Sequence, residues 1–317
     1  MNNDMFQIEF IPWVHEWRRY LYSREAALPE MLENLRSGLD EEGQETVDKT
    51  FERFMHIFPA PEVHENMPFL VPLHSYFTPG EIQRMDGFED AYLIARRKVE
   101  EKYPHSKSLY HGKMIMTLKS GTTLFPEKTR NALEGRAIID GGACWGDSMI
   151  AFDSYKPSKT FCFEPDEKNY GDLITTISHG NFNHVTPIKK ALSDQCGETT
   201  FYTQQYPGSN MGASLKQTHS AVHPVQVAIS TIDDEISSHE DIGLIKLDVE
   251  GYELEALHGA EKTIRRCKPA LVVALYHTAK DFFEVKPYLE SLNLGYNFYI
   301  RKLVRTSSVY GLYLLAF

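Results

Sequence analysis

Three acidic residues stand where apolar segments end, as they would at the tips of buried strands. The acids are Asp140, Glu164 and Asp248, which follow residues 137–139, 161–163 and 244–247. If these segments are parallel strands of an open α/β sheet, the acids lie at the edge where such sheets bind ligands. Carboxylates grouped there favour a ligand that is cationic and rich in hydroxyl groups.

The first acid opens a glycine-rich turn, Asp140-Gly141-Gly142-Ala143-Cys144-Trp145-Gly146. Glycines let the backbone turn sharply and approach a ligand closely, and the helix expected next offers free N–H groups that suit a carboxylate. Asp147 or Ser148 can cap that helix. Ala143 replaces the middle glycine of a dinucleotide fingerprint, so the turn fits pyrophosphate poorly. S-adenosylmethionine has a sulfonium, an ammonium and a ribose diol, so it fits the three acids. A tight structural turn is the alternative.

Two further positions extend this hypothesis. Glu164 lies 24 residues after Asp140, where an acid can accept hydrogen bonds from ribose hydroxyls; a solvated acid at the sheet edge is the alternative. His277 follows the strand predicted after Asp248, at the mouth of the same pocket. An imidazole titrates near neutral pH and can take a hydroxyl proton, although a structural histidine would occupy the position equally well.

The elements that must position these residues begin near residue 106. Apolar periodicity predicts strands at 137–140, 160–164, 183–188, 224–229, 243–248, 270–275, 295–301 and 309–316. It predicts helices at 147–155, 166–179, 252–258 and 281–291. Strands that alternate with helices imply a mainly parallel, Rossmann-like α/β sheet. The last two strands lack a helix between them and should form an antiparallel hairpin.

Residues 1–105 differ from the rest of the chain in composition and pattern. They hold 20 acidic and 11 basic residues, and so most of the net charge of −11. Such an acidic region repels phosphate backbones, so we expect no nucleic-acid partner. Apolar residues recur there at helical spacing, which predicts an acidic helical region that packs on residues 106–317 or on a second copy of the chain. Its aromatic stripes are Trp13, Trp17, Phe51, Phe54 and Phe58.

The cysteines and the hydropathy pattern bear on the compartment. The four cysteines form no Cys-x-x-Cys pair, and one of them lies in an apolar strand, which is typical of a reduced protein. Residues 1–4 lack the basic segment of a signal peptide, and no run of 18 apolar residues is long enough to span a membrane. We expect a cytoplasmic protein with no membrane span.

Several motifs, taken together and in order, resemble the FkbM family of S-adenosylmethionine-dependent methyltransferases over about residues 136–317. The motifs are Asp140-x-Gly142-Ala143-x-x-Gly146-Asp147-Ser148, Phe163-Glu164-Pro165-Asp166, Ala191-Leu192-Ser193-Asp194, Ile245-Lys246-Leu247-Asp248-Val249-Glu250-Gly251-Tyr252-Glu253 and Leu257-His258-Gly259-Ala260. The resemblance implies a seven-stranded class I methyltransferase fold and O-methylation, often of sugars or polyketides.

The resemblance also implies roles for individual residues. Asp140, Gly142 and Gly146 would line the methionine end of the cofactor, with Ala143, Asp147 and Ser148 beside them in the same loop. Glu164 would bind the ribose, and Ala191 or Asp194 would lie near the adenine. Independently of the resemblance, the position of Asp248 at the end of a strand beside the glycine-rich turn predicts that it orients cofactor or acceptor.

The sequence thus predicts an O-methyltransferase that acts on a hydroxyl group of a sugar or other glycan. His277 is the expected base, Asp248 its partner in catalysis, and no residue cluster calls for a metal ion. We expect a small-molecule or glycan acceptor, and a homo-oligomer is possible. Two alternatives are a non-catalytic protein that binds the cofactor or recruits a partner, and an NAD-dependent oxidoreductase.

Overall fold

The computed structural model describes residues 6–9, 14–57, 69–72, 88–109, 113–204, 214–215, 221–303 and 310–317. Within them, the main sheet has seven strands in the order β11-β12-β10-β9-β3-β4-β5. In chain order these are β3 (Ala137–Gly141), β4 (Thr160–Phe163), β5 (Val185–Ile188), β9 (Ile242–Leu247), β10 (Ala270–Ala274), β11 (Phe298–Lys302) and β12 (Leu312–Ala316). Strands β10, β9, β3, β4 and β5 pair in parallel. The predicted seven-stranded α/β sheet is confirmed.

The segment at 224–229 is a strand, but it lies outside this sheet, contrary to its place among the predicted main strands. It belongs to β8, which forms a separate three-stranded sheet in the order β6-β8-β7. The bounds are Ala191–Leu192 for β6, Gly197–Gln204 for β7 and Ala221–Ser230 for β8. Strand β7, which the sequence analysis did not predict, pairs antiparallel with β8 along its whole length.

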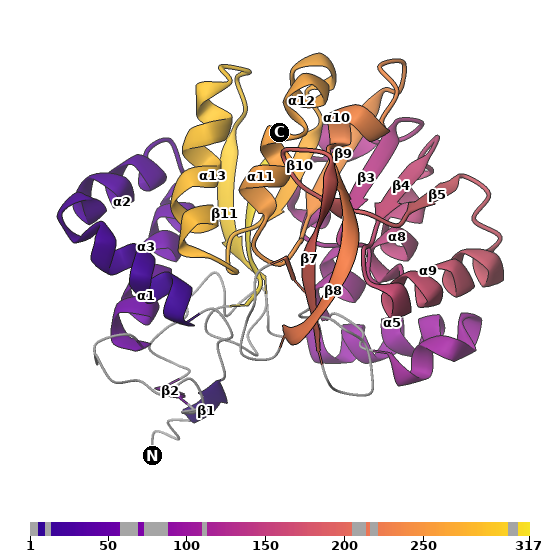
Figure 1. Cartoon of the computed structure of the whole chain (residues 1–317), viewed down its shortest axis with the longest axis horizontal. Helices are drawn as coiled ribbons and strands as arrows, with labels where there is room; N and C mark the ends of the chain where they lie inside the picture. Colours follow the sequence, from indigo (N-terminus) through magenta and orange to yellow (C-terminus); the bar gives the residue numbers. More distant parts are fainter. Residues whose placement is uncertain are drawn as a thin grey trace. The chain divides into compact units, whose positions relative to one another are not determined.

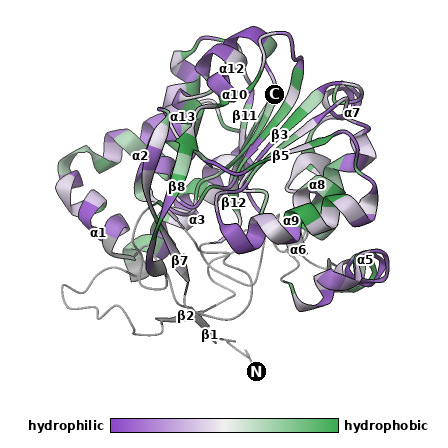
Figure 2. Cartoon of the chain, turned by 45° about the vertical axis from the view of Figure 1, so that its right-hand side comes forward, coloured by the Kyte–Doolittle hydropathy of each residue, from purple (hydrophilic) through white to green (hydrophobic). Residues whose placement is uncertain are grey.

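The chain divides into two compact units, residues 88–273 with 315–317 and residues 1–87 with 274–314. The helices of the first unit are α5 (Phe88–Lys102), α6 (Lys113–Leu118), α7 (Glu127–Asn131), α8 (Asp147–Phe152), α9 (Glu167–Gly180), α10 (Ile232–Glu235), α11 (Glu253–His258) and α12 (Glu261–Cys267). Helices α8 and α9 flank the β3–β5 side of the sheet (Figure 1). Met149, Cys162 and Leu173 join them to β4 in one core, and β3 and α8 are largely green in the hydropathy colouring of Figure 2.

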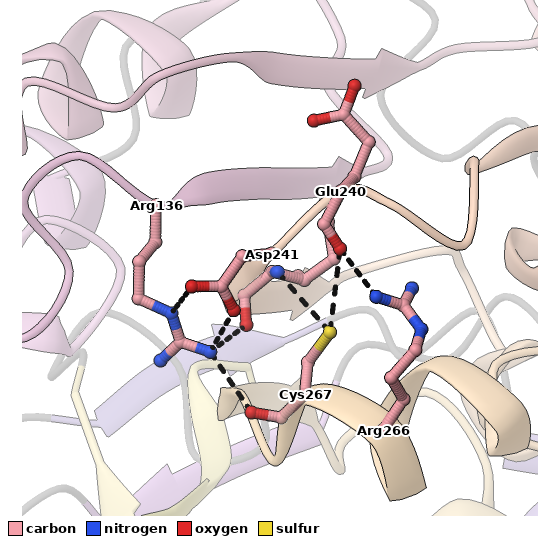
Figure 3. A network of polar contacts seen from close by, with 6 residues as sticks. Arg136, Glu240, Asp241, Arg266 and Cys267 are labelled. Carbon is pink, nitrogen blue, oxygen red and sulfur yellow. Dashed lines mark hydrogen bonds and ion pairs between the residues drawn. The ribbon is translucent and has the colours of Figure 1, made fainter.

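An arginine network ties together the ends of three elements in this unit (Figure 3). The guanidinium of Arg136, which precedes β3, pairs with both carboxylate oxygens of Asp241 at 2.8 and 3.0 Å. It also donates to the carbonyls of Ile242 and Cys267, at 2.6 and 3.0 Å. Strand β9 begins at Ile242 and helix α12 ends at Cys267. The Arg136 side chain therefore links the start of β3 to the start of β9 and to the end of α12.

The second unit joins N-terminal helices to elements near the C-terminus. Its elements are β1 (Phe6–Glu9), α1 (Val14–Ser23), α2 (Leu28–Arg36), α3 (Glu41–Ile57), β2 (Phe69–Pro72), α13 (Ala279–Ser291) and strand β11. Trp17 stacks on Phe54 with ring centroids 3.5 Å apart and lies 5.6 Å from the ring of Phe282 on α13. The Tyr20 hydroxyl donates to Glu284 at 2.7 Å.

The stripes of Trp17, Phe51 and Phe54 therefore pack against α13, which lies within residues 106–317. Trp13 and Phe58 lie outside the described residues. The predicted boundary at residues 105 and 106 stays a prediction. None of the helices in the described ranges is long and apolar enough to cross a membrane.

Candidate functional site

The three strand-end acids lie at one edge of the sheet because their strands are neighbours. Strand β3 pairs in parallel with β4 on one side and β9 on the other, with Asp140 opposite Cys162 and Lys246. Glu164 and Asp248 each follow the last residue of their strand. The predicted gathering of these acids is therefore confirmed at the level of the sheet.

The glycine-rich turn is held mainly by bonds within the protein. Gly142, Cys144 and Gly146 all have left-handed backbone conformations, with φ of 73°, 48° and 95°. The N–H groups of Gly142 and Ala143 donate to the Phe163 carbonyl at 3.0 and 2.9 Å. A left-handed residue other than glycine is unfavourable unless its surroundings hold it. Here the N–H of Cys144 donates to the Glu164 carboxylate at 2.8 Å.

Gly142 is required by the protein's own backbone. A Cβ atom at this position would lie 1.9 Å from the carbonyl oxygen of Asp248. The glycine therefore lets β3 and the turn after β9 approach each other closely, whereas the sequence analysis attributed its role to the approach of a ligand. Its predicted contact with the cofactor stays a prediction.

We expect Gly142→Ala to lower the free energy of unfolding by about 3 kcal/mol or more, because it combines a backbone clash with a left-handed φ. Urea unfolding would measure the loss. The matched control is Gly171→Ala in α9, where a Cβ meets nothing within 4 Å and alanine favours the helix by about 0.5–1 kcal/mol. A Gly142→Ala protein within 1 kcal/mol of the wild type would contradict the close approach.

Asp140 is fully buried, and its carboxylate makes one ion pair and one hydrogen bond, on different oxygens; the ion-paired oxygen has no hydrogen-bond partner among the described residues. One oxygen lies 3.0 Å from the ammonium of Lys246, and the other accepts the Ser148 hydroxyl at 2.5 Å. Asp147 is also buried and accepts the backbone N–H of Ser148 at 3.0 Å. Gly146 occupies the N-cap position of α8. Asp140, Ser148 and Gly146 thus fix how β3 passes into α8.

Glu164 is the acid whose environment best suits a hydroxyl donor. It is buried, and its two carboxylate oxygens accept the backbone N–H groups of Cys144 and Asp166 at 2.8 and 3.0 Å. Burial raises the pKa of this carboxyl to about 7, against the lowering effect of its hydrogen bonds to Asp166, Cys144 and Asn169. A carboxylate has about four acceptor sites, so Glu164 keeps capacity for at least one ribose hydroxyl.

Asp248 is half-buried and begins a tightly fastened turn. The carboxylate of buried Glu253 accepts the N–H groups of Val249 and Gly251 at 2.8 and 3.0 Å. The hydroxyl of Ser214 donates to the carbonyl of Glu250 at 2.7 Å, and Glu250 has a left-handed φ of 57°. These bonds fix the backbone on which Asp248 stands, beside Gly141, whose carbonyl accepts the Asp248 N–H at 3.2 Å.

The remaining predicted residues lie in three different settings. Ala191 is buried in β6, in parallel register with Ile229 of β8. Asp194 is exposed and accepts the hydroxyl of Ser193 at 3.2 Å. His277 is fully buried in the unit that contains α1, where its carbonyl accepts the indole N–H of Trp17 at 3.2 Å. The convergence of His277 and Asp248 on one hydroxyl stays a prediction.

Three residues with evident roles at the site were not singled out from the sequence: Lys246, Glu253 and Ser214. Lys246 had a signal, because a lysine inside the apolar run 242–247 is buried wherever that run is a central strand, and a buried lysine needs an anionic partner. Glu253 and Ser214 act through backbone groups of a turn whose path the sequence does not reveal.

The donor set at this edge fits S-adenosylmethionine. Glu164 offers a buried acceptor for the ribose, and the turn from Gly142 to Gly146 borders it through the bond from Cys144. Gly146, Ala143, Asp147 and Ser148 lie in that turn or directly after it. This is the place in an open parallel sheet where the fold class binds such cofactors.

The comparisons with known proteins identify the family of the chain. The model of the methyltransferase FkbM domain matches residues 140–298, half of the 317-residue chain. The protein named Methyltransferase 1 of Beauveria bassiana (strain ARSEF 2860) is 27% identical over 175 residues, which cover 49% of this chain and 70% of that protein. The 2-O-methyltransferase NoeI of Sinorhizobium fredii (strain NBRC 101917 / NGR234) is 24% identical over 147 residues, 41% of this chain and 60% of that protein.

A solved structure shares the fold. The methyltransferase FkbM of Methylobacillus flagellatus KT is 17% identical, with a TM-score of 0.59, and the alignment covers 95% of this chain and 62% of that one. The shared fold therefore extends beyond the residues that the family model matches. With its seven-stranded sheet, glycine-rich turn and strand-end acids, the chain belongs to the FkbM family of methyltransferases, whose class uses S-adenosylmethionine.

Proposed function

We propose that this protein transfers the methyl group of S-adenosylmethionine to a hydroxyl oxygen of a sugar or other glycan. The observation that carries the proposal is the turn after β9, which begins at Asp248 and is held by hydrogen bonds to the Glu253 carboxylate. It holds a half-buried carboxylate beside the glycine-rich turn, where it can accept a hydrogen bond from an acceptor hydroxyl and orient it. The name of the relative NoeI, a 2-O-methyltransferase, supports oxygen as the acceptor atom.

The bound cofactor supplies an electrophilic methyl group on a sulfonium. The protein's part is to hold a hydroxyl in line with that methyl and to take its proton as the new bond forms. In this proposal Asp248 orients the hydroxyl, His277 takes the proton, and Glu164 holds the ribose. The family assignment favours methyl transfer over the NAD-dependent alternative. A second argument against NAD is that Ala143 stands where the dinucleotide fingerprint has its middle glycine.

The test is methyl transfer from labelled S-adenosylmethionine to three separate pools: glycans and glycosides, small carboxylic acids, and RNA. We expect label in the glycan pool, as a methyl ether that survives mild alkali and adds about 14 mass units to one residue. Alkali-labile label would indicate carboxyl methylation, and label in RNA would indicate a nucleic-acid substrate; either result would contradict the proposal. Tight binding of S-adenosylhomocysteine without transfer to any pool would support the non-catalytic alternative.

A further inference from the structure

We propose that Lys246 is a positioning residue of the cofactor site, which holds the carbonyls of Gly141 and Gly142, and that Asp140 is its counter-ion and not a ligand of the cofactor. The inference rests on the cofactor of the family and is independent of the methyl acceptor. It departs from the role that the resemblance implied for Asp140.

The ammonium of Lys246 has three N–H donors and three close acceptors. It lies 3.0 Å from the Asp140 carboxylate and donates to the carbonyls of Gly141 and Gly142 at 3.0 and 2.8 Å. A lysine ammonium has three hydrogens and no acceptor; two of them are used in the hydrogen bonds to these carbonyls, and the approach to Asp140 is an ion pair. Because Lys246 is buried and ion-paired with Asp140, its ammonium is not placed to bind a cofactor carboxylate.

Asp140 is equally enclosed. Its side chain has no exposed surface, one oxygen faces Lys246, and the other accepts the Ser148 hydroxyl. A cofactor ammonium would have to displace one of these partners to reach the carboxylate. Burial alone would lower the pKa of Lys246, but Asp140 and then Asp248 raise it above its ordinary value, so the ammonium stays charged and Asp140 has a permanent partner.

Packing alone does not explain a lysine at this position. The residues on either side of it in β9, Ile245 and Leu247, are fully buried and apolar. Replacing a buried ion pair by apolar residues is often neutral or stabilising, so a buried pair by itself is weak evidence of a structural need. What an apolar residue cannot do is bind two backbone carbonyls.

Those carbonyls belong to the start of the glycine-rich turn. The turn has three left-handed residues in five positions, Gly142, Cys144 and Gly146. Lys246 holds its beginning from β9, and Glu164 holds the Cys144 N–H from β4. Because Glu164 is also the proposed ribose ligand, the path of the turn and the position of that ligand are coupled. Loss of the Lys246 bonds should weaken cofactor binding without removing any cofactor contact.

The pairing also sets the local charge. The Lys246 and Asp140 charges cancel, so removing either one leaves a unit charge next to the turn. That charge acts on the sulfonium of S-adenosylmethionine, while the thioether of S-adenosylhomocysteine is neutral. The ratio of the two dissociation constants therefore reports on charge, and the affinity for S-adenosylhomocysteine reports on the shape of the turn.

The experiment compares Lys246→Met, Asp140→Asn and the double variant in the full chain, by urea unfolding and by calorimetric titration with both ligands. In Asp140→Asn the amide oxygen can still face Lys246, and the Ser148 hydroxyl can turn to accept from the amide. We expect Lys246→Met to weaken S-adenosylhomocysteine binding by about tenfold or more, as loss of a charged hydrogen-bond donor does. Asp140→Asn should change it by less than about threefold.

The double variant separates positioning from mere stability. Since it removes both members of the buried ion pair, we expect it to recover most of the urea midpoint that Lys246→Met loses, yet to bind S-adenosylhomocysteine as weakly as Lys246→Met does. Relative to S-adenosylhomocysteine, S-adenosylmethionine should bind at least about threefold more weakly in Asp140→Asn, and more tightly in Lys246→Met. If Lys246→Met does not fold, the affinities of Asp140→Asn and the double variant for S-adenosylhomocysteine can still be compared. The proposal expects the double variant to bind more weakly.

Lys286→Met is the matched control, because Lys286 is a fully buried lysine on α13 paired with Glu290 at 2.6 Å. It should lower the urea midpoint and leave both dissociation constants unchanged. Two results would overturn the proposal. One is wild-type affinity in the double variant, which would make the pair purely structural. The other is an Asp140→Asn protein that loses as much S-adenosylhomocysteine affinity as Lys246→Met, which would make Asp140 a cofactor ligand.

Discussion

Replacing His277 with alanine should lower kcat for methyl transfer by about 10²–10⁴-fold and leave the dissociation constant of S-adenosylhomocysteine almost unchanged. This is the usual size of the contribution of a positioned general base. The argument is topological. His277 follows β10, which pairs in parallel with β9, and Asp248 follows β9 directly. The ends of parallel neighbouring strands meet at one edge of a sheet, and this topology is what supports the proposal that His277 acts together with Asp248.

The local structure around His277 makes a clean substitution possible. Its carbonyl, which accepts from Trp17, is a backbone group that alanine keeps. The next residue, Thr278, caps α13 by accepting the N–H of Asp281 at 3.0 Å and is not altered. The imidazole itself contacts the ring of Tyr276, with centroids 4.1 Å apart. Alanine therefore leaves a small cavity, and the expected loss of unfolding free energy is about 1–3 kcal/mol.

Three measurements distinguish a base from a structural histidine. The pH–rate profile of kcat should lose its acidic limb in His277→Ala. His277→Gln, which keeps hydrogen bonding and cannot accept the proton, should be as slow as the alanine variant. The exposed His179 on α9 provides the control, and His179→Ala should keep wild-type kcat. If kcat survives in His277→Ala, Asp248 becomes the better candidate, and Asp248→Asn should then reduce both kcat and cofactor affinity.

Much of the main sheet could be predicted because its strands are continuous apolar runs. Residues 242–247 and 270–274 are buried at every position, which is typical of parallel strands covered on both faces. Residues 224–229 are equally strand-like, but their partners are β7 and β6. Which strands a segment pairs with depends on the sheet edges that are unpaired when it folds. A local sequence pattern does not show which edges these are.

The acidic residues of the candidate site could be predicted from the sequence, but the groups that bind them in the folded protein could not. A carboxylate at a strand tip is visible in the sequence, whereas its counter-ion lies about 100 residues away, as Lys246 does from Asp140. The role of Gly142 was assigned to a ligand because the sequence does not show that the Asp248 carbonyl would meet its Cβ. Residue types indicate which chemistry is available, and long-range packing decides which groups are already engaged.

Replacing Glu164 with alanine should weaken S-adenosylhomocysteine binding by about 2–4 kcal/mol, or roughly 30- to 1,000-fold, because a charged acceptor of ribose hydroxyls is lost. The bond to the Cys144 N–H is lost with it, which loosens the turn. The control is Glu167→Ala, three residues further on, whose carboxylate is exposed and pairs with Lys189. It should bind as the wild type does. Wild-type affinity in Glu164→Ala would show that the ribose lies elsewhere.

The pKa of Glu164 gives this prediction a second, independent test. The folded-state pKa is about 7, against an ordinary value of 4.5, so between these pH values the folded protein holds a proton that the unfolded chain releases. Stability from this group is therefore present below about pH 4.5 and is lost as the pH rises towards 7, by on the order of 3 kcal/mol. Glu164→Gln removes the titration and should be less sensitive to pH over this range in urea unfolding.

Cofactor binding should respond to pH in the opposite sense. Ribose hydroxyls donate to the carboxylate form, so the dissociation constant of S-adenosylhomocysteine should be steady above about pH 8 and rise by up to about tenfold per unit as the pH falls below 7. Glu164→Gln should bind weakly at every pH and show no such slope. A wild-type slope that persists in Glu164→Gln would assign the titration to another group. Burial thus acts on both equilibria through the same proton: it makes the folded protein less stable as the pH rises towards 7, and cofactor binding strengthens as that proton is lost.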